Sequence, residues 1–222
     1  MFAPEVDLAQ QPSAPPDLAQ RLWAGNQDLA QACVQHPFVR GLADGSLPAA
    51  HFRAYVAQDA YFLEAFARAY AFALARCPDR HGLEAFQGLI AGVVDELKLH
   101  ASYASRWGVD LGTTTPARAT LAYTDFLLAK AGVASVGDVC AAMTPCMRLY
   151  AHLGQTLARG GAARAANPYR EWVETYAAPE FESLAATLEG LLNRYAQDTP
   201  MVRGCYRRAM QLELDFFSHP TM

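Results

Sequence analysis

The sequence predicts an all-α fold, and three observations support this. From Asp17 onward the chain consists of long segments rich in Ala, Leu, Arg and Gln, which are strong helix formers. Apolar residues recur in these segments at intervals of three and four, and no stretch shows a sustained alternation with a period of two. Val and Ile, which favour strands, are sparse. The length of 222 residues suits one large domain, so we expect a single helical domain over 17–222 after a proline-rich, mobile tail over 1–16.

The first three helices are expected at 17–36, 48–77 and 79–107. Asp17 and Asp79 have the side chain that an N-cap position favours, since a carboxylate accepts a free backbone N–H of the first turn. The first helix should end before Pro37, because proline disfavours helical geometry in the residue that precedes it.

The remaining helices are expected to start at 116, to cover 136–158, to start at 168, and to cover 180–196 and 200–218. Pro116 and Pro168 each follow an N-cap residue and would occupy the first helical position, where the missing N–H costs nothing. Pro145 falls inside the helix over 136–158. An interior proline costs about 3 kcal/mol or more, so we expect a kink there.

The composition bears on partners and location. Apolar residues make up 52% of the chain and charged residues 18%, against about 25% in an average soluble protein. We therefore expect much surface to be buried, in a core and between subunits. Eighteen basic and 22 acidic residues without a basic cluster disfavour nucleic-acid binding. Apolar stretches are too short to span a membrane, and the N-terminus lacks the features of a secretory signal, which together suggest a cytoplasmic protein. Five cysteines without CxxC spacing should be reduced thiols.

One predicted helix face is aromatic except for a single carboxylate. Tyr55, Asp59, Phe62 and Phe66 fall at i, i+4, i+7 and i+11, so they share a face. Asp59 is either a structural residue, satisfied by a buried hydrogen bond or ion pair, or a functional group. Burial would raise its pKa and a donor would lower it.

Two further side chains are candidates for a catalytic role. Glu213 lies one turn from Phe216 and Phe217, so it is either a solvated rim residue or a carboxylic acid held neutral by apolar surroundings, able to act as a general acid. Cys146 follows Pro145 and lies one turn before Tyr150. A lone cysteine is more often an inert core residue than a nucleophile, unless a base or donor lies beside it.

A weak metal-like pattern also occurs. Glu96 with His100, and Asp215 with His219, are spaced i, i+4, and Glu64 or Asp59 could add an oxygen ligand. The doubled Glu-x-x-His pattern of di-iron bundles is absent. Motifs of serine hydrolases and of nucleotide-binding loops are absent too.

Five separated segments, taken together, resemble the TenA family, also called thiaminase II. They are HPFVRGLADGSLPAAHFRAYVAQDAYFL (36–63), AYTDFL (122–127), AAMTPCMRLYAHLG (141–154), EWVETYAAPEF (171–181) and ELDFF (213–217). The resemblance covers about residues 20–218 and points to the cysteine-containing branch. It implies a haem-oxygenase-like helical bundle, usually a homotetramer, that binds an aminopyrimidine between its helices. The implied activity is hydrolysis of aminomethyl-pyrimidine, a thiamin breakdown product, to hydroxymethylpyrimidine, and cleavage of thiamin itself, with no metal or organic cofactor.

The resemblance also implies roles for single residues. Cys146 matches the nucleophile that adds to the pyrimidine, Glu213 the acid that protonates the departing amine, and Asp59 the residue that binds the amidine-like edge of the ring. Family residues that line the site match Phe62, Tyr123, Tyr150, Tyr176 and Phe216. Phe62 stands where many members have Tyr, and Phe217 where Trp is usual, so substrate preference within the class is open.

Four hypotheses follow, in this order. The first is an aminopyrimidine hydrolase. The second is a non-catalytic pyrimidine-binding protein of the same fold, and the third is a metal-dependent oxidase that uses Glu96, His100, Asp215 and His219. A transcriptional regulator ranks last, given the acidic charge balance.

Overall fold

The structure, a computed structural model, describes residues 15–218, so most of the expected tail and His219 lie outside the described residues. Within 15–218 the chain forms α-helices and one short 3-10 helix, with no strand, which confirms the predicted all-α class. In order, these elements are α1 (Leu18–Ala24), α2 (Gln27–Gln35), α3 (Pro37–Asp44), α4 (Ala49–Ala75), α5 (Arg80–Trp107), η1 (Leu111–Thr113), α6 (Arg118–Val133), α7 (Val136–Arg159), α8 (Arg170–Ala177), α9 (Pro179–Tyr195) and α10 (Pro200–Ser218).

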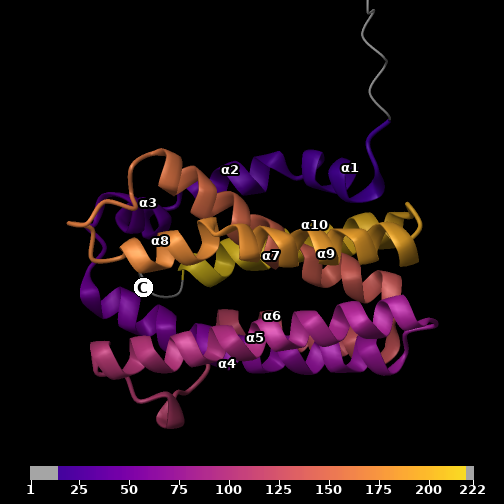
Figure 1. Cartoon of the computed structure of the whole chain (residues 1–222), viewed down its shortest axis with the longest axis horizontal. Helices are drawn as coiled ribbons and strands as arrows, with labels where there is room; N and C mark the ends of the chain where they lie inside the picture. The colour runs from indigo at the N-terminus through magenta and orange to yellow at the C-terminus, as the bar shows by residue number, and fades with distance from the viewer. Residues whose placement is uncertain (1–14, 219–222) are drawn as a thin grey trace, which may run out of the picture.

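Helix α7 is the centre of the bundle. It packs against α8, α9 and α10, while α4 packs against α5 and α6 to form a second group of long helices (Figure 1). The short helices α1 and α2 cross the other side, against α9 and α10. Most of α7 is buried because it is covered on several sides, and its buried residues include Cys146 and Tyr150. Functional side chains on this helix therefore face the interior.

The expected first helix is wrong in one respect, because the chain divides it into two. The side-chain amide of Asn26 donates to the carbonyl oxygen of Leu22 at 2.8 Å, and this bond ends the helical ladder at that point. The eight-residue helix α3 was not expected. Its first free N–H group, that of Phe38, donates to the His36 ring at 3.2 Å, and Gly45 ends the helix at a φ of 85°.

Two expected helix starts are displaced by two residues, because side-chain hydrogen bonds hold the preceding loops. Gln58 accepts from the backbone N–H of Ala117 at 2.8 Å and donates to the carbonyl oxygen of Thr115 at 3.1 Å, so α6 starts at Arg118. Asn167 accepts from the backbone N–H of Tyr169 at 3.0 Å, and its amide donates to the carbonyl oxygens of Leu42 and Ala162 at 2.9 and 2.8 Å. It thereby ties the loop before α8 to α3.

Helix α7 continues through Pro145 from Val136 to Arg159, and the kink there stays a prediction. Near its C-terminal end, Gly154 allows α8 to approach closely. A Cβ atom at Gly154 would overlap the backbone of Tyr176 and Ala177. The absence of a side chain at this position therefore brings Tyr176 against the central helix.

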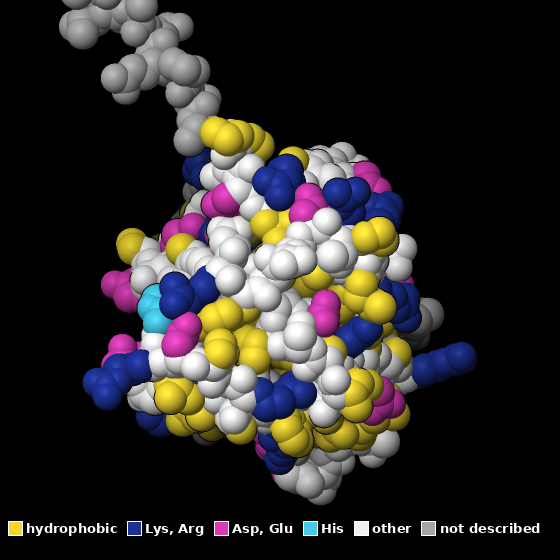
Figure 2. Space-filling view, turned by 90° about the vertical axis from the view of Figure 1, so that its right-hand side faces the viewer, with side chains coloured by type: hydrophobic (Ala, Val, Ile, Leu, Met, Phe, Trp, Pro, Cys, Tyr) yellow, Lys and Arg dark blue, Asp and Glu magenta, His cyan; other side chains and the backbone are white. Residues whose placement is uncertain are grey.

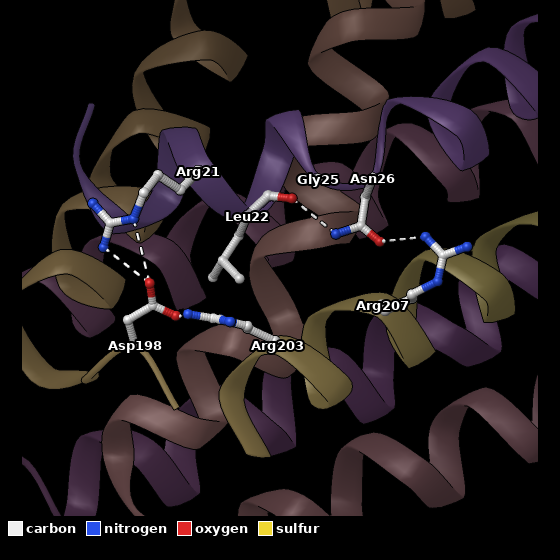
Figure 3. Close-up of a pocket in the computed structure, with 7 residues that line it drawn as sticks. All are labelled: Arg21, Leu22, Gly25, Asn26, Asp198, Arg203 and Arg207. Carbon is white, nitrogen blue, oxygen red and sulfur yellow. Dashed lines mark hydrogen bonds and ion pairs between the residues drawn. The ribbon is translucent and has the colours of Figure 1, made fainter. Parts of the chain in front are cut away.

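The surface mixes charges of both signs. On the face shown in Figure 2, basic, acidic and apolar side chains are interspersed. At the α1–α10 junction, the hollow drawn in Figure 3 contains Arg21 and Arg203, which both pair with Asp198, at 3.3 and 2.6 Å. Arg207 pairs with Asp28 at 2.7 Å. Among the described helices, none is both long and apolar enough for a membrane span.

Candidate active site

A small cavity lies inside the bundle, where α4, α5, α7, α8 and α9 meet. Its volume is about 10 Å³, which is about the room that one water molecule needs. Its walls combine aromatic rings with carboxyl groups and one thiol. The lining residues are Asp59, Phe62, Leu63, Phe66, Glu96, Cys146, Met147, Tyr150, Tyr176 and Phe181.

The thiol of Cys146 lines this cavity and lies beside the carboxyl group of Glu213 on α10, whose charge acts on it. Tyr123 on α6 donates to Oε1 of the same carboxyl group at 2.6 Å. Burial raises the pKa of Glu213 to about 8, against the effect of the Tyr123 hydrogen bond and the neighbouring Cys146 thiol. Burial, followed by the charge of Glu213, raises the pKa of the Cys146 thiol well above its usual range. The resting site therefore favours a neutral thiol, and a thiolate requires that a base take its proton.

Asp59 forms a buried ion pair. Its Oδ2 atom lies 2.7 Å from Nε2 of His100, and Nδ1 of His100 lies 3.0 Å from the backbone carbonyl oxygen of Glu96. Both neighbours of the ring are acceptors, so both ring nitrogens must donate and the ring is a cation. Burial lowers the pKa of His100, but the hydrogen bond and charge of Asp59 and the charge of Glu96 outweigh it and raise the pKa to about 9. Asp59 is thus buried and paired, as one of the two interpretations of the sequence predicts. It also lines the cavity.

The hydroxyl group of Tyr55 connects Asp59 to two other aromatic side chains. It donates to Oδ2 of Asp59 at 2.9 Å, and it accepts from Nε1 of Trp172 at 3.2 Å. The hydroxyl group of Tyr150 lies 3.4 Å away. Within residues 15–218, all hydrogen bonds to the Asp59 carboxylate go to Oδ2. Its Oδ1 atom is therefore unused by the described protein groups.

Glu96 adds a third carboxyl group to the cavity wall. Its Oε1 atom accepts from the hydroxyl group of Tyr176 at 2.6 Å. Burial and the nearby charge of Asp59 raise the pKa of Glu96 to about 7, although the charge of His100 and the Tyr176 hydrogen bond act in the other direction. The cavity wall thus includes one carboxyl group, that of Glu96, which gains and loses a proton near neutral pH.

Of the five expected substrate-binding residues, Phe62, Tyr150 and Tyr176 line the cavity. Tyr123 and Phe216 do not line it, but both support Phe62 from behind, with ring centroids 4.8 and 5.7 Å from its own. Glu213 also lies behind the wall and reaches the cavity through Cys146. The structure therefore brings together the expected residues, in two layers.

The expected four-residue metal set does not form. Glu96 and His100 point into the interior, whereas Asp215 is exposed on α10 and His219 lies outside the described residues. Glu64 is exposed and pairs with Arg68 at 3.0 Å. Asp59, Glu96 and His100 do offer ligand atoms within 4.8 Å of one another. Tyr176 already donates to Oε1 of Glu96, and Tyr55 and His100 already donate to Oδ2 of Asp59.

Parts of the site do not follow from the sequence. The pattern around Glu96 and His100 indicates only metal ligands, and Tyr55 is conspicuous only as part of an aromatic stripe. Trp172 and Phe181 lie in the segment 171–181, but the pattern there indicates no role for either. Helical spacing shows which residues share a face, but it does not show which side chains face one another across two helices.

Fold and site together define a class, namely a helical bundle with an enclosed aromatic cavity that is lined by a cysteine and by carboxyl groups. The model of the TENA/THI-4/PQQC family matches residues 23–221. The chain belongs to this family, as the sequence resemblance indicated.

Curated relatives agree with this assignment. The chain is 34% identical over 184 residues, 81% of its length and 82% of the relative, to the aminopyrimidine aminohydrolase of Halalkalibacterium halodurans. It is 32% identical over 235 residues to the mitochondrial bifunctional TH2 protein of Arabidopsis thaliana. That alignment covers 95% of this chain but 38% of the plant protein, so the chain spans less than half of that relative.

Solved structures confirm the expected fold. A TenA homologue from P. horikoshii superposes with a TM-score of 0.84 at 23% identity, over 92% of this chain and 98% of the other. Haem oxygenase-1 from Synechocystis superposes with a TM-score of 0.62 at 17% identity, over 92% of each chain. The haem-oxygenase-like bundle is therefore the fold of this chain.

Proposed function

We propose that this protein is an aminopyrimidine aminohydrolase that converts aminomethyl-pyrimidine to hydroxymethylpyrimidine for thiamin salvage, and that it also cleaves thiamin. The observation that carries the proposal is that Cys146 and Asp59 line one enclosed cavity and that the carboxyl group of Glu213 lies beside the Cys146 thiol. The 34% identity to a protein named aminopyrimidine aminohydrolase supports the same activity.

Asp59 holds the substrate ring. The amidine-like edge of an aminopyrimidine presents an amino donor and a ring nitrogen, and the unused Oδ1 atom of Asp59 accepts from the amino group. The His100 ion pair keeps this carboxylate charged and fixed in position. Phe62, Tyr150 and Tyr176 contact the faces of the ring, which orients it for attack at little entropic cost.

Cys146 supplies the nucleophile and Glu213 moves its proton. The Cys146 sulfur forms a bond to an electron-poor ring carbon while its proton passes to the Glu213 carboxylate. Electrons pushed from the ring then break the exocyclic C–N bond, and Glu213 returns that proton to the departing amine. Water adds to the exocyclic carbon, the C–S bond breaks, and the thiol regains a proton. The products are ammonia and hydroxymethylpyrimidine, so the reaction consumes one water.

The pairing explains how a cysteine with a raised pKa can react. A buried thiol is a poor nucleophile, but a carboxylate beside it can accept its proton in the same step as the sulfur attacks. Burial raises the pKa of Glu213 to about 8, so this carboxylate is a better base than a solvated one, and its acid form keeps the proton near neutral pH until the amine departs. One residue thus serves as base and then as acid.

A turnover assay with the variant Cys146→Ala tests the proposal. We expect release of hydroxymethylpyrimidine to fall by about 1000-fold or more, as for loss of an essential nucleophile. Cys205→Ala is the matched control, since Cys205 is a buried cysteine that does not line the cavity, and it should keep full turnover. Unchanged turnover in Cys146→Ala would remove Cys146 from the mechanism. Saturable binding by the native protein without any product would identify a pyrimidine-binding protein instead.

We propose further that the protein is a homotetramer and works in the cytoplasm, without a nucleic-acid partner. Low charge content and exposed large apolar side chains, such as Phe72 and Val133, support association between copies. Free cysteines, Cys146 among them, suit a reducing compartment. Light scattering on purified protein measures the subunit number, and a monomer would contradict the tetramer.

A further inference from the structure

A surface groove adjoins the buried cavity. It has a volume of about 350 Å³ and lies between α5 and the corner where α8 meets α9. Glu96 and Phe181 line both the groove and the cavity, so these two side chains form the wall that separates them. The other residues that line the groove are Gly92, Asp95, Leu99, Thr175, Ala178, Glu180 and Leu184.

We infer that this groove is the entrance to the candidate active site, that Phe181 is its gate, and that the groove selects substrates with a cationic amine. The substrate part of this inference rests on the proposed function, while the position of the entrance does not. The cavity has room for about one water, so a pyrimidine ring enters only if a wall moves. The wall shared with the groove is the one that separates the cavity from a solvent-filled space.

Phe181 is well placed to move. It lies in the first turn of α9, directly after the corner at Ala178 and Pro179, and 8% of it is exposed. Its main ring partner in the described residues is Tyr176, with perpendicular rings whose centroids lie 4.9 Å apart. A change of its side-chain rotamer would expose Cys146 without unfolding a helix.

Gly92 lets α9 pack closely on α5 at the edge of the groove. A Cβ atom at Gly92 would lie 2.8 Å from Cδ1 of Leu184, on the facing helix α9. The Leu184 side chain therefore occupies the space next to this glycine, beside the gate.

The charge of the groove indicates its ligand class. Asp95, Glu96 and Glu180 line it, and no basic residue does. Lys98 pairs with Asp95 at 2.7 Å, but both side chains are largely exposed, so this pair offsets little of the acidic character. An ammonium group on a pyrimidine, or another cationic substituent at the same carbon, is attracted to such an entrance.

Alkylation of Cys146 tests the gate without any substrate. Native protein and the variant Phe181→Ala are treated with iodoacetamide, and mass spectrometry measures the reaction rate at each cysteine. We expect Cys146 to react about tenfold faster in Phe181→Ala, because the rate follows the population of open conformations. The matched control is Leu188→Ala, which removes a buried apolar side chain from α9 that lines neither groove nor cavity.

The other cysteines show whether the effect is local. Cys140 and Cys205 are buried away from the gate, so general loosening would speed their reaction together with that of Cys146. Faster reaction at Cys146 alone supports the gate. An equal increase at all three cysteines, or an unchanged rate at Cys146 in Phe181→Ala, would overturn it.

A second measurement separates the entrance from the proposed function. Stopped-flow fluorescence follows the binding of hydroxymethylpyrimidine to each protein. If the gate limits entry, association and dissociation should both speed up by about tenfold in Phe181→Ala, while Kd changes less. If the native protein does not bind this pyrimidine, but Cys146 alone is alkylated faster in Phe181→Ala, the proposed function is refuted and the position of the entrance is supported. If the native protein and Phe181→Ala bind at equal rates, the gate is refuted and the proposed function still stands.

Discussion

Nε2 of His100 and Oδ2 of Asp59 lie 2.7 Å apart, and their side chains are 2% and 5% exposed. The pair joins α5 to α4 at the wall of the cavity. Each charge has left water, so each depends on the other, and on Tyr55 and the Glu96 backbone carbonyl, for its hydrogen bonds. The pair thus holds the Asp59 side chain in one position inside an aromatic interior.

Removal of the positively charged His100 ring should therefore lower the stability of the folded protein. We expect His100→Ala to lower the free energy of unfolding by about 3–5 kcal/mol, the usual loss when one partner of a buried pair is removed. Urea unfolding followed by circular dichroism measures this loss. Lys98→Ala is the control on the same helix, because Lys98 forms an exposed pair with Asp95 and should cost about 0–1 kcal/mol. Similar losses in the two variants would contradict the buried ion pair.

Stability should fall as the pH rises from about 5 to 9. The folded-state pKa is raised to about 9 for His100, about 8 for Glu213 and about 7 for Glu96. At these three groups the unfolded chain binds fewer protons than the folded protein in this range, so they make the slope of unfolding free energy against pH negative; burial lowers the pKa of His36 and His152, which offsets part of this slope near pH 6. The stabilisation from His100 is complete below its unfolded value of 6.5 and is lost as pH rises through about 9. The stabilisation from Glu213 and Glu96 is complete below their unfolded pKa of 4.5, and it is lost as pH rises through their folded pKa values of about 8 and about 7.

Urea unfolding at several pH values measures this slope. Glu213→Gln should make it less negative by up to about 1.4 kcal/mol per pH unit between pH 5 and 8, which is the contribution of one proton. An Asp215→Asn variant, on the exposed face of the same helix, should leave the slope unchanged. A slope of zero in the native protein would show that these groups titrate as they do in the unfolded chain.

Much of the fold follows from the sequence, because long amphipathic segments and capping residues act locally. The short helix α3 does not, since Pro37 both ends one helix and starts another. The break at Asn26 depends on one side-chain amide, and the start of α6 on Gln58 from a distant helix.

The candidate site likewise has residues that the sequence predicts and residues that it does not. Asp59 is conspicuous in the sequence because a lone carboxylate interrupts an aromatic stripe. The pairing of His100 with Asp59 joins two helices 41 residues apart in the chain, which helical spacing within one segment does not reveal. The same spacing suggested Asp215 as a ligand, although this residue faces solvent on α10.

The close approach of α7 and α8 at Gly154 should not tolerate any side chain. A Cβ atom there would overlap the backbone of Tyr176, and backbone cannot move aside as the end of a flexible side chain can. We expect Gly154→Ala to destabilise the protein by about 1–3 kcal/mol, as overpacking does, and to weaken pyrimidine binding because Tyr176 is displaced. Gly190→Ala is the control, since α9 has open space at that position. Calorimetry and ligand titration measure the two effects, and equal melting temperatures for both variants would contradict the prediction.

The pH dependence of turnover should report on Glu213 and His100. The Glu213 carboxylate must be free of its proton to accept that of Cys146, so kcat/KM should rise as pH approaches about 8, the pKa of Glu213. It should fall again as His100 loses its proton near pH 9, because Asp59 then loses its charged partner. Glu213→Gln should lower kcat/KM by about 100-fold or more and remove the rising limb, since its amide cannot take the proton. The variant Cys205→Ala should keep the bell shape of the native profile. A native profile that is flat between pH 6 and 9 would contradict the proton transfer between Cys146 and Glu213, whatever the substrate.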